Sequence, residues 1–202
     1  MYINLSNKTG VFIHIPKAAG TSIYKSLGPN IVRYKKHCTA LFVKNDISMR
    51  LPDIWDKLYK VSWVRNPWQR AVSLWKYTKD ITPKGYAGIV SNPHFKKWLF
   101  DPKVGALCED EPNNRTPLSA LTYVSDLDGN IIVDFIGQLE HIDEDMSRLK
   151  YELYGRRSGH KVKHENNRKL GFHYTRLYDN ESREYIADIC KWEIDKFNYK
   201  FD

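Results

Sequence analysis

Residues 11–22, with the sequence VFIHIPKAAGTS, join an apolar run to a Pro-Lys pair, small residues and two hydroxyl residues. The apolar part predicts a buried strand over 11–15, and the residues after the glycine predict a helix over 21–28. Small residues at such a junction let backbone N–H groups approach an anion, and the helix N-terminus adds positive potential. Lys17 and the two hydroxyl residues add side-chain donors. The segment therefore predicts a phosphate-binding loop within an α/β fold.

The order of residues in this loop differs from that of kinases and ATPases. Their loop needs G-x-x-x-x-G-K-[ST], in which the lysine follows the second glycine. Here Lys17 precedes Gly20, which argues against an ordinary kinase or ATPase. A purely structural alternative is that Thr21 or Ser22 caps a helix, but it leaves the lysine and the small residues unexplained.

A second segment, residues 61–75, repeats the strand-to-helix pattern with an arginine at the junction. We expect a strand over 60–64, with Arg65 at the carboxyl edge where open α/β sheets bind ligands. Pro67 is a good first helical residue, and we expect the helix to run to about residue 79. Arg65 would give an anion a forked, charge-assisted contact, and Ser73 would give it a hydroxyl. The alternative is a helix start with a surface arginine.

The rest of the chain alternates strand and helix patterns. Further strands are expected at 31–34 and in a hairpin of 121–124 and 131–136 around a turn at 126–130, and further helices at 52–59, 93–100, 143–154 and 181–197. This alternation predicts a three-layer, P-loop-like α/β fold with a central parallel sheet of about four to five strands flanked by helices. We expect one domain over residues 1–202, in which the loops 80–117 and 155–172 lie near substrate or nucleotide.

The composition of the chain indicates which classes of partner it binds and in which compartment it works. The net charge of +8 favours anionic partners such as nucleotides, nucleic acid or acidic glycans. Cys38, Cys108 and Cys190 lie far apart, so we expect neither a disulfide framework nor a cysteine metal clip, and a reducing compartment fits best. No apolar run approaches the roughly 18 residues of a membrane helix, and the N-terminus lacks a signal-peptide pattern. We therefore expect a cytoplasmic protein without a transmembrane segment and without a metal.

Two anion sites on neighbouring strand ends suit a nucleotide with phosphates at both ends of its ribose. At this point the sequence resembles the sulfotransferase superfamily, which uses 3′-phosphoadenosine-5′-phosphosulfate (PAPS). Residues 15–22, IPKAAGTS, resemble the 5′-phosphosulfate loop of that family, and residues 64–73, VRNPWQRAVS, resemble its 3′-phosphate element. The sequences of these two motifs are more similar to the carbohydrate-type branch, sulfotransferase family 2-like, than to the branch that acts on phenols and steroids. Weaker similarities lie at 36–40, 133–140 and 178–199.

The resemblance implies roles for individual residues. It implies that Lys17 stabilises charge on the leaving phosphate, and that Arg65 and Ser73 hold the 3′-phosphate. It assigns the 5′-phosphate to Lys17 and to the residues that follow it, namely Ala18, Ala19, Gly20, Thr21 and Ser22. Arg168 and Lys169, in a basic loop, would also contact the nucleotide, although a merely solvated loop is equally compatible. Ile23 stands where the branch for phenols and steroids has an adenine-stacking aromatic residue, so adenine must pack elsewhere or on an aliphatic surface.

Sulfuryl transfer requires that the acceptor hydroxyl lose its proton, and histidine is the natural base at neutral pH. His37 is the first candidate, because related families place a catalytic base in a comparable region. Glu140 is the carboxylate alternative. We expect His14 to be a buried histidine with its hydrogen bonds satisfied. His164 and His173 are weaker candidates.

The predicted function is transfer of a sulfuryl group from PAPS to an acceptor hydroxyl by in-line displacement, without a metal. The expected acceptor is a carbohydrate or glycolipid, including an acidic saccharide, and a small metabolite is the alternative. Two other functions stay open: an ATP-dependent P-loop-like phosphotransferase, and a non-catalytic binder of nucleic acid or acidic glycan. No RNA-binding fingerprint is present, so no specific nucleic-acid partner is expected.

Overall fold

The computed structural model describes residues 9–81, 92–102, 104, 117–155, 161–162 and 172–202. The chain divides into two compact units. The first contains residues 1–64 and 122–167, and the second contains residues 65–121 and 168–202.

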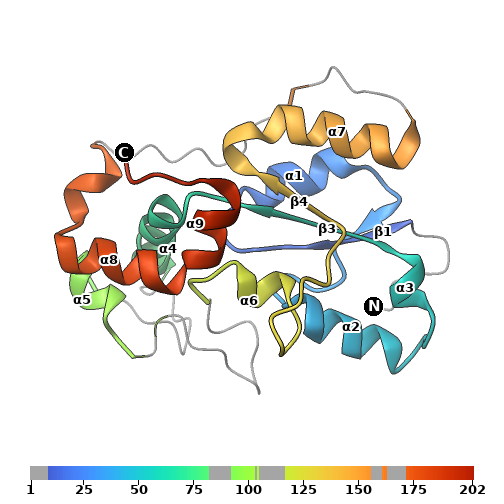
Figure 1. Cartoon of the computed structure of the whole chain (residues 1–202), viewed down its shortest axis with the longest axis horizontal. Coiled ribbons are helices and arrows are strands. Elements are labelled where there is room, and N and C mark those ends of the chain that lie inside the picture. Colours follow the sequence, from blue (N-terminus) through green and yellow to red (C-terminus); the bar gives the residue numbers. More distant parts are fainter. Residues whose placement is uncertain (1–8, 82–91, 103, 105–116, 156–160, 163–171) are drawn as a thin grey trace. The chain divides into compact units, whose positions relative to one another are not determined.

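The first unit contains a four-stranded parallel sheet with the strand order β2–β1–β3–β4 (Figure 1). The strands are β1 (Gly10–Ile13), β2 (Ile31–Val32), β3 (Tyr59–Val64) and β4 (Phe135–Gln138). Every residue of β1 is buried, as expected for a central strand of a parallel sheet that is covered on both faces. The predicted α/β fold with a central parallel sheet flanked by helices is confirmed, with four strands.

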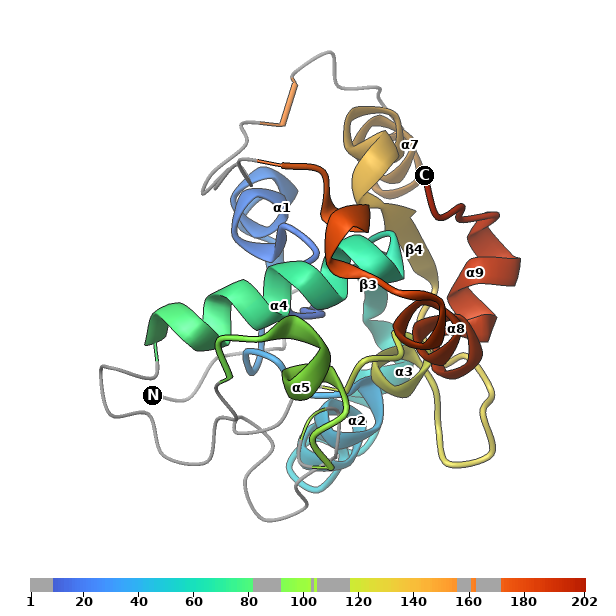
Figure 2. The same cartoon turned by 90° about the vertical axis from the view of Figure 1, so that its left-hand side faces the viewer.

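Helices lie on both sides of this sheet (Figures 1 and 2). On one side are α1 (Gly20–Leu27) and α7 (Ile142–Tyr154), and on the other are α2 (Ala40–Ser48) and α3 (Ile54–Lys57). One hydrophobic core joins strand side chains to α1 and α7, with Phe12, Ile23, Leu27, Val61, Trp63, Phe135, Ile142, Met146 and Leu149 among its members. Side chains alternate along a strand, so the neighbours of Phe12 in β1 face the opposite layer.

The second unit is helical in its described part. It contains α4 (Pro67–Ile81), α5 (Phe95–Leu99), η3 (Tyr174–Leu177), α8 (Asn180–Ile189) and α9 (Lys191–Phe197). α4 packs against α5, η3 and α8. Buried Arg70 of α4 donates to the carbonyls of Pro117, at 2.9 Å, and Leu118. Buried Glu193 of α9 accepts from the N–H of Ala120 at 2.7 Å, so residues 117–120 are held from two helices.

The predicted hairpin is wrong. Residues 121–124 form a helical turn, α6 (Leu121–Val124), although their β-branched and aromatic side chains favour a strand. Ser119 Oγ accepts from the N–H of Leu121 at 3.2 Å, which supports a helical start at this point. The turn at 126–130 is present, but it closes only one antiparallel bridge, between Ser125 and Ile131. The strand predicted at 131–136 begins later, at Phe135, and pairs in parallel with β3.

Two helices also differ from the sequence-based expectation. The sequence analysis misses α2, whose signal is the N-cap Thr39 followed by buried Val43 and Ile47 four residues apart. The single helix expected over 181–197 is two helices, α8 and α9, which meet at Cys190. Cys190 ends one helix and caps the next, with its side chain buried and its Sγ 3.3 Å from the carbonyl of Leu118.

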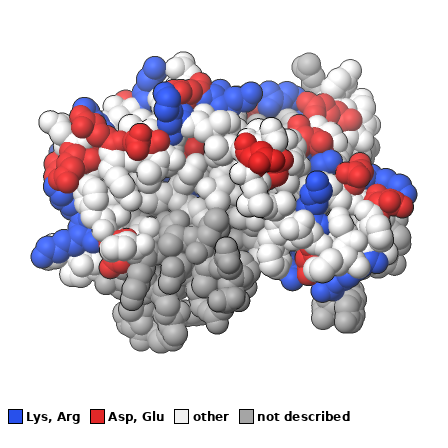
Figure 3. Space-filling view, turned by 60° about the horizontal axis from the view of Figure 1, so that its bottom comes forward, with Lys and Arg blue, Asp and Glu red and all other residues white. Residues whose placement is uncertain are grey.

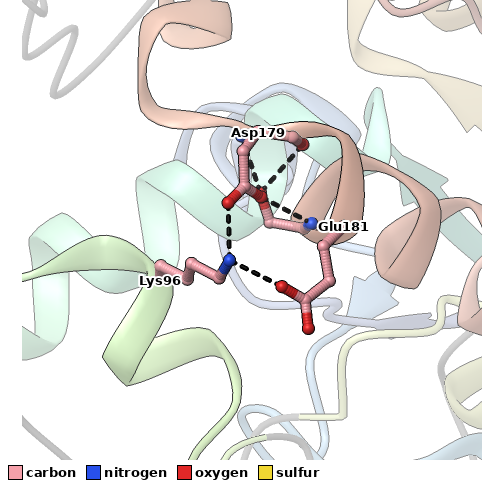
Figure 4. A network of polar contacts seen from close by, with 4 residues as sticks. Lys96, Asp179 and Glu181 are labelled. Carbon is pink, nitrogen blue, oxygen red and sulfur yellow. Dashed lines mark hydrogen bonds and ion pairs between the residues drawn. The ribbon is translucent and has the colours of Figure 1, made fainter.

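A polar network in the second unit joins α5 to the N-terminus of α8 (Figure 4). Lys96 Nζ lies 2.6 Å from Asp179 Oδ2 and 2.6 Å from Glu181 Oε2. Asp179 is also the N-cap of α8, because its Oδ1 accepts from the N–H of Ser182 at 2.9 Å. The hydrogen bonds from Lys96 and then Ser182 hold the pKa of the Asp179 carboxyl well below its usual range.

We expect Asp179→Asn to lower the Tm slightly at pH 7, because asparagine keeps the N-cap and loses the exposed ion pair. Folding depresses the pKa of this carboxyl, so its stabilisation is present above the unfolded value of about 3.9 and declines as the pH falls further. The Tm difference from wild type should therefore shrink between pH 7 and about pH 3 in thermal unfolding. Asp179→Ala, which also loses the cap, should stay the less stable variant at both pH values. A difference for Asp179→Asn that grows on acidification would contradict this account.

Candidate active site

The predicted phosphate loop leads from β1 into α1 in the first unit. Lys17 and Ala19 have φ values of 67° and 55°, which is a left-handed backbone rarely seen in residues other than glycine. Left-handed residues next to right-handed ones turn successive N–H groups toward one side and so form an anion-binding concavity. Ala19 is the N-cap of α1 and supplies no side-chain hydrogen bond to the first turn. The loop therefore has the backbone geometry of an anion site at a helix N-terminus.

Gly20, the first residue of α1, is needed because the ring of His14 packs directly against it. A Cβ at position 20 would overlap Nε2, Cδ2 and Cε1 of His14. His14 follows β1, is buried, and stacks on Phe12 with ring centroids 5.5 Å apart. The glycine thus lets α1 begin in contact with the end of β1, in addition to keeping side-chain atoms away from the loop.

His37 lies beside this loop. It follows β2, the direct neighbour of β1, so the two connections leave the sheet at the same edge. The rings of His37 and His14 are edge to face, with centroids 4.7 Å apart. His37 is half-buried and has a φ of 66°, and such strained backbone conformations cluster at functional sites. The structure therefore brings His37 to the strand end that carries the phosphate loop.

The segment that carries His37 is fixed by α2 on both sides. Before it, Tyr34 donates to Asp46 Oδ2 at 2.6 Å, and Lys35 Nζ lies 3.4 Å from Asp46 Oδ1. After it, Thr39 Oγ1 accepts from the N–H of Phe42 at 3.1 Å. The hydrogen bond from Tyr34 is the main contact that holds the pKa of the Asp46 carboxyl below its usual range. Asp46 is an anchor of this connection that the sequence analysis misses.

Glu140 has a different position in the unit. It lies in η2 (Leu139–His141), directly after β4, and its side chain is exposed. In the sheet, β3 separates β4 from β1. Of the two candidate bases, His37 is therefore the one whose connection follows a strand adjacent to β1, which leads into the phosphate loop.

His14 is buried, as expected from the sequence, but it is not satisfied. Its Nδ1 has no hydrogen-bond partner within the part of the chain that the structure describes. Burial lowers the pKa of the His14 imidazole to about 2, and nearby His37, Arg33, Lys36 and Lys17 act in the same direction. The ring is therefore neutral, and the side chains that surround it make this end of the sheet electropositive, which suits an anion.

Arg65 and Ser73 belong to the second unit, and both are half-buried. Arg65 is the residue after β3 in the chain, and its guanidinium donates to Gln69 Oε1 at 3.4 Å. Ser73 lies four residues beyond Gln69 on α4, so these two side chains share one helix face. A shared anion contact for Arg65 and Ser73 stays a prediction. The structure adds Gln69 as a neighbour of Arg65, which the sequence analysis misses although the four-residue spacing is visible.

The structure gives fewer contacts for the remaining candidate site residues. Arg168, Lys169 and His164 lie outside the described residues, as do large parts of the predicted loops 80–117 and 155–172. His173 makes a local contact, with Nδ1 2.9 Å from Thr175 Oγ1. Val162 is described, and it anchors its loop because its side chain packs into the core of the first unit and its N–H donates to Asp143 at 2.7 Å.

The described residues show neither a cluster of metal-binding side chains nor a membrane-spanning helix. Among them, no three or more histidine, cysteine, aspartate and glutamate side chains come together as a metal site. None of the described helices is long and apolar enough to cross a membrane. Cys38 and Cys190 are buried free thiols.

Comparison with protein families gives a match over nearly the whole chain. The family described as "Sulfotransferase family" matches residues 7–200, which include both segments predicted to bind anions. No curated protein matches the chain. The family match confirms the resemblance drawn from residues 15–22 and 64–73.

Proposed function

Because the chain belongs to the sulfotransferase family and is therefore a PAPS-dependent sulfotransferase, we propose that it sulfates a hydroxyl of a carbohydrate or glycolipid. Sulfuryl transfer to a hydroxyl is supported by one observation in the first unit, a loop with anion-site backbone geometry beside a histidine on the neighbouring connection. The carbohydrate or glycolipid class comes from the resemblance of residues 15–22 and 64–73 to the carbohydrate-type branch. An anion site and a proton acceptor are the two parts that sulfuryl transfer to a hydroxyl needs. A small metabolite remains the alternative acceptor.

The described residues fit a nucleotide at this loop. Lys17 and Ala19 turn backbone N–H groups together, and the space beside Gly20 is filled by His14 rather than by a side chain of the loop. The 5′-phosphate end would be held by the N–H groups of residues 18–22, the hydroxyls of Thr21 and Ser22, and the Lys17 ammonium. The 3′-phosphate would be held by Arg65 and Ser73. We include Arg168 and Lys169 as further nucleotide contacts from the sequence alone.

In this mechanism the protein acts by positioning and by charge stabilisation. PAPS, when bound, supplies the activated sulfuryl group and a phosphate as leaving group. Lys17 would stabilise the negative charge that develops on the leaving phosphate side. His37 would accept the proton of the acceptor hydroxyl at a ring nitrogen. Glu140 is the alternative base.

A non-catalytic nucleic-acid binder has less support. Such proteins gather lysine and arginine on one face or along one helix. On the face drawn in Figure 3, lysine and arginine side chains are interspersed with aspartate and glutamate over the described residues. The net charge of +8 is therefore not concentrated into a single patch on this face.

Adenosine 3′,5′-bisphosphate, the nucleotide product of the proposed reaction, is expected to raise the Tm of the protein by several degrees. A ligand at about 100 times its Kd stabilises the folded state by about 2.7 kcal/mol, which thermal unfolding detects easily. ATP with Mg²⁺ at the same concentration should give a clearly smaller shift. A larger shift with ATP would overturn the proposal in favour of a phosphotransferase. Salt-sensitive RNA binding without any response to the bisphosphate would favour the non-catalytic binder.

A further inference from the structure

His14 is the buried polar side chain of the first unit that the proposed mechanism leaves without a role. It is 4% exposed, and its Nδ1 has no hydrogen-bond partner within the described residues. A buried polar atom without a partner lowers stability, and an aliphatic side chain of similar size would avoid that cost. An imidazole at this position therefore calls for an explanation other than the stability of the core.

The ring of His14 touches both parts of the proposed catalytic apparatus. On one side it packs against Gly20, where α1 begins and the phosphate loop ends. It stands edge to face with His37, with ring centroids 4.7 Å apart and an interplanar angle of 66°. Its stacking on Phe12, at 5.5 Å and 17°, holds the ring in one orientation from β1. His14 is thus a fixed spacer between the loop and the candidate base.

The charge of His14 also suits a place beside a base. Burial keeps the pKa of its imidazole far below the ordinary value, so the ring stays neutral at physiological pH. The groups that act on it are His37, Arg33 and Lys36 from the connection after β2, and Lys17 from the phosphate loop, and all of them are potential cations. A lysine or arginine at position 14 would repel a protonated His37, whereas a neutral imidazole does not.

We propose that His14 is a positioning residue for His37: it holds the His37 ring against the phosphate loop and accepts a hydrogen bond, at its unpaired nitrogen, from the His37 ring N–H that faces away from the acceptor hydroxyl. The inference rests on the proposed role of His37 as base. The proton that leaves the acceptor hydroxyl stays on His37, and His14 accepts a hydrogen bond without becoming protonated. His14 therefore acts through another residue and does not itself touch the substrate.

The test compares His14→Leu, which keeps apolar volume, with His14→Asn, which keeps a polar side chain at this position. We expect His14→Leu to unfold at the same Tm as wild type or a higher one, because it removes an unsatisfied polar atom. Its kcat should fall by about tenfold or more, as for a disturbed general base, with the Kd for adenosine 3′,5′-bisphosphate unchanged. His14→Asn should regain part of the lost kcat. Turnover is measured as release of the bisphosphate from PAPS with neutral and acidic oligosaccharides as acceptors.

Trp63→Phe is the matched control, because Trp63 is buried in the same sheet and its Nε1 also has no partner among the described residues. This control should leave kcat and the pH profile unchanged, whereas His14→Leu should alter the acid limb of kcat against pH. An unchanged kcat in His14→Leu, or an equal loss of kcat and of bisphosphate affinity, would overturn the inference.

Histidine ring signals in NMR separate this inference from the proposed function. The signals of His37 should shift in His14→Asn whether or not the protein transfers a sulfuryl group. If wild type neither binds the bisphosphate nor shows turnover, the proposed function fails while the contact can still be seen. If wild type is active and the His37 signals do not respond to either His14 variant, the inference alone is wrong.

Discussion

Replacing Lys17 by alanine is expected to lower kcat by about 10²–10³-fold, with a much smaller effect on the Kd for adenosine 3′,5′-bisphosphate. Removing one preorganised donor to developing charge typically costs about 2.7–4 kcal/mol in the transition state. Lys17 is placed for such a role because it lies in the turn between β1 and α1, where the proposed anion site uses the backbone N–H groups. In the proposed binding mode, ground-state affinity depends mainly on those N–H groups, which the substitution keeps.

The backbone makes this variant a clean probe of the side chain. Lys17 already has a left-handed φ of 67°, and alanine in that conformation carries a strain similar to that of lysine. Lys25, a basic residue in the last turn of α1, gives a matched control, and Lys25→Ala should keep the wild-type kcat. Steady-state kinetics with PAPS give kcat, and titration with adenosine 3′,5′-bisphosphate gives its Kd. Full activity of Lys17→Ala would remove Lys17 from the mechanism.

The sequence predicts those parts of the site whose secondary structure depends on neighbouring residues in the chain. Residues 15–22 encode a strand, a turn of small residues and a helix start within eight positions, and the structure has β1, the turn and α1 there. In the same way, Pro67 after Arg65 predicts the start of α4. Each of these elements depends on neighbours in the sequence, so a single chain is enough to infer them.

The contacts that the sequence does not predict join residues that are far apart in the chain. His14 contacts His37 because β2 and β1 are adjacent in the sheet. Neither segment alone predicts the order of strands in the sheet. Tyr34 and Asp46 meet only once α2 exists, and the pattern analysis misses that helix. The predicted hairpin is wrong for a related reason. Tertiary packing, rather than the local preference of residues 121–124 for a strand, makes them helical.

Replacing Arg65 by alanine is expected to raise the Kd for adenosine 3′,5′-bisphosphate by about 10–100-fold, which corresponds to the loss of one or two charge-assisted hydrogen bonds. Gln69 accepts a hydrogen bond from the Arg65 guanidinium at 3.4 Å and lies on the same face of α4 as Ser73. The guanidinium is therefore oriented along that face of the helix. The effect on kcat should be smaller, because the 3′-phosphate does not change charge during transfer. Arg65→Lys should recover only part of the affinity, since an ammonium cannot form a bidentate contact.

A second ligand turns this substitution into a test of which phosphate Arg65 holds. Adenosine 5′-phosphate lacks the 3′-phosphate, so its Kd, measured by calorimetry, should be the same for wild type and Arg65→Ala. Lys79→Ala, in the last turn of α4, controls for the loss of a positive charge on that helix. If Arg65→Ala weakened both nucleotides equally, Arg65 would act through the 5′ end or through the fold. The assignment of a doubly phosphorylated nucleotide to two separate anion sites would then be wrong, because it depends on Arg65 recognising the second phosphate.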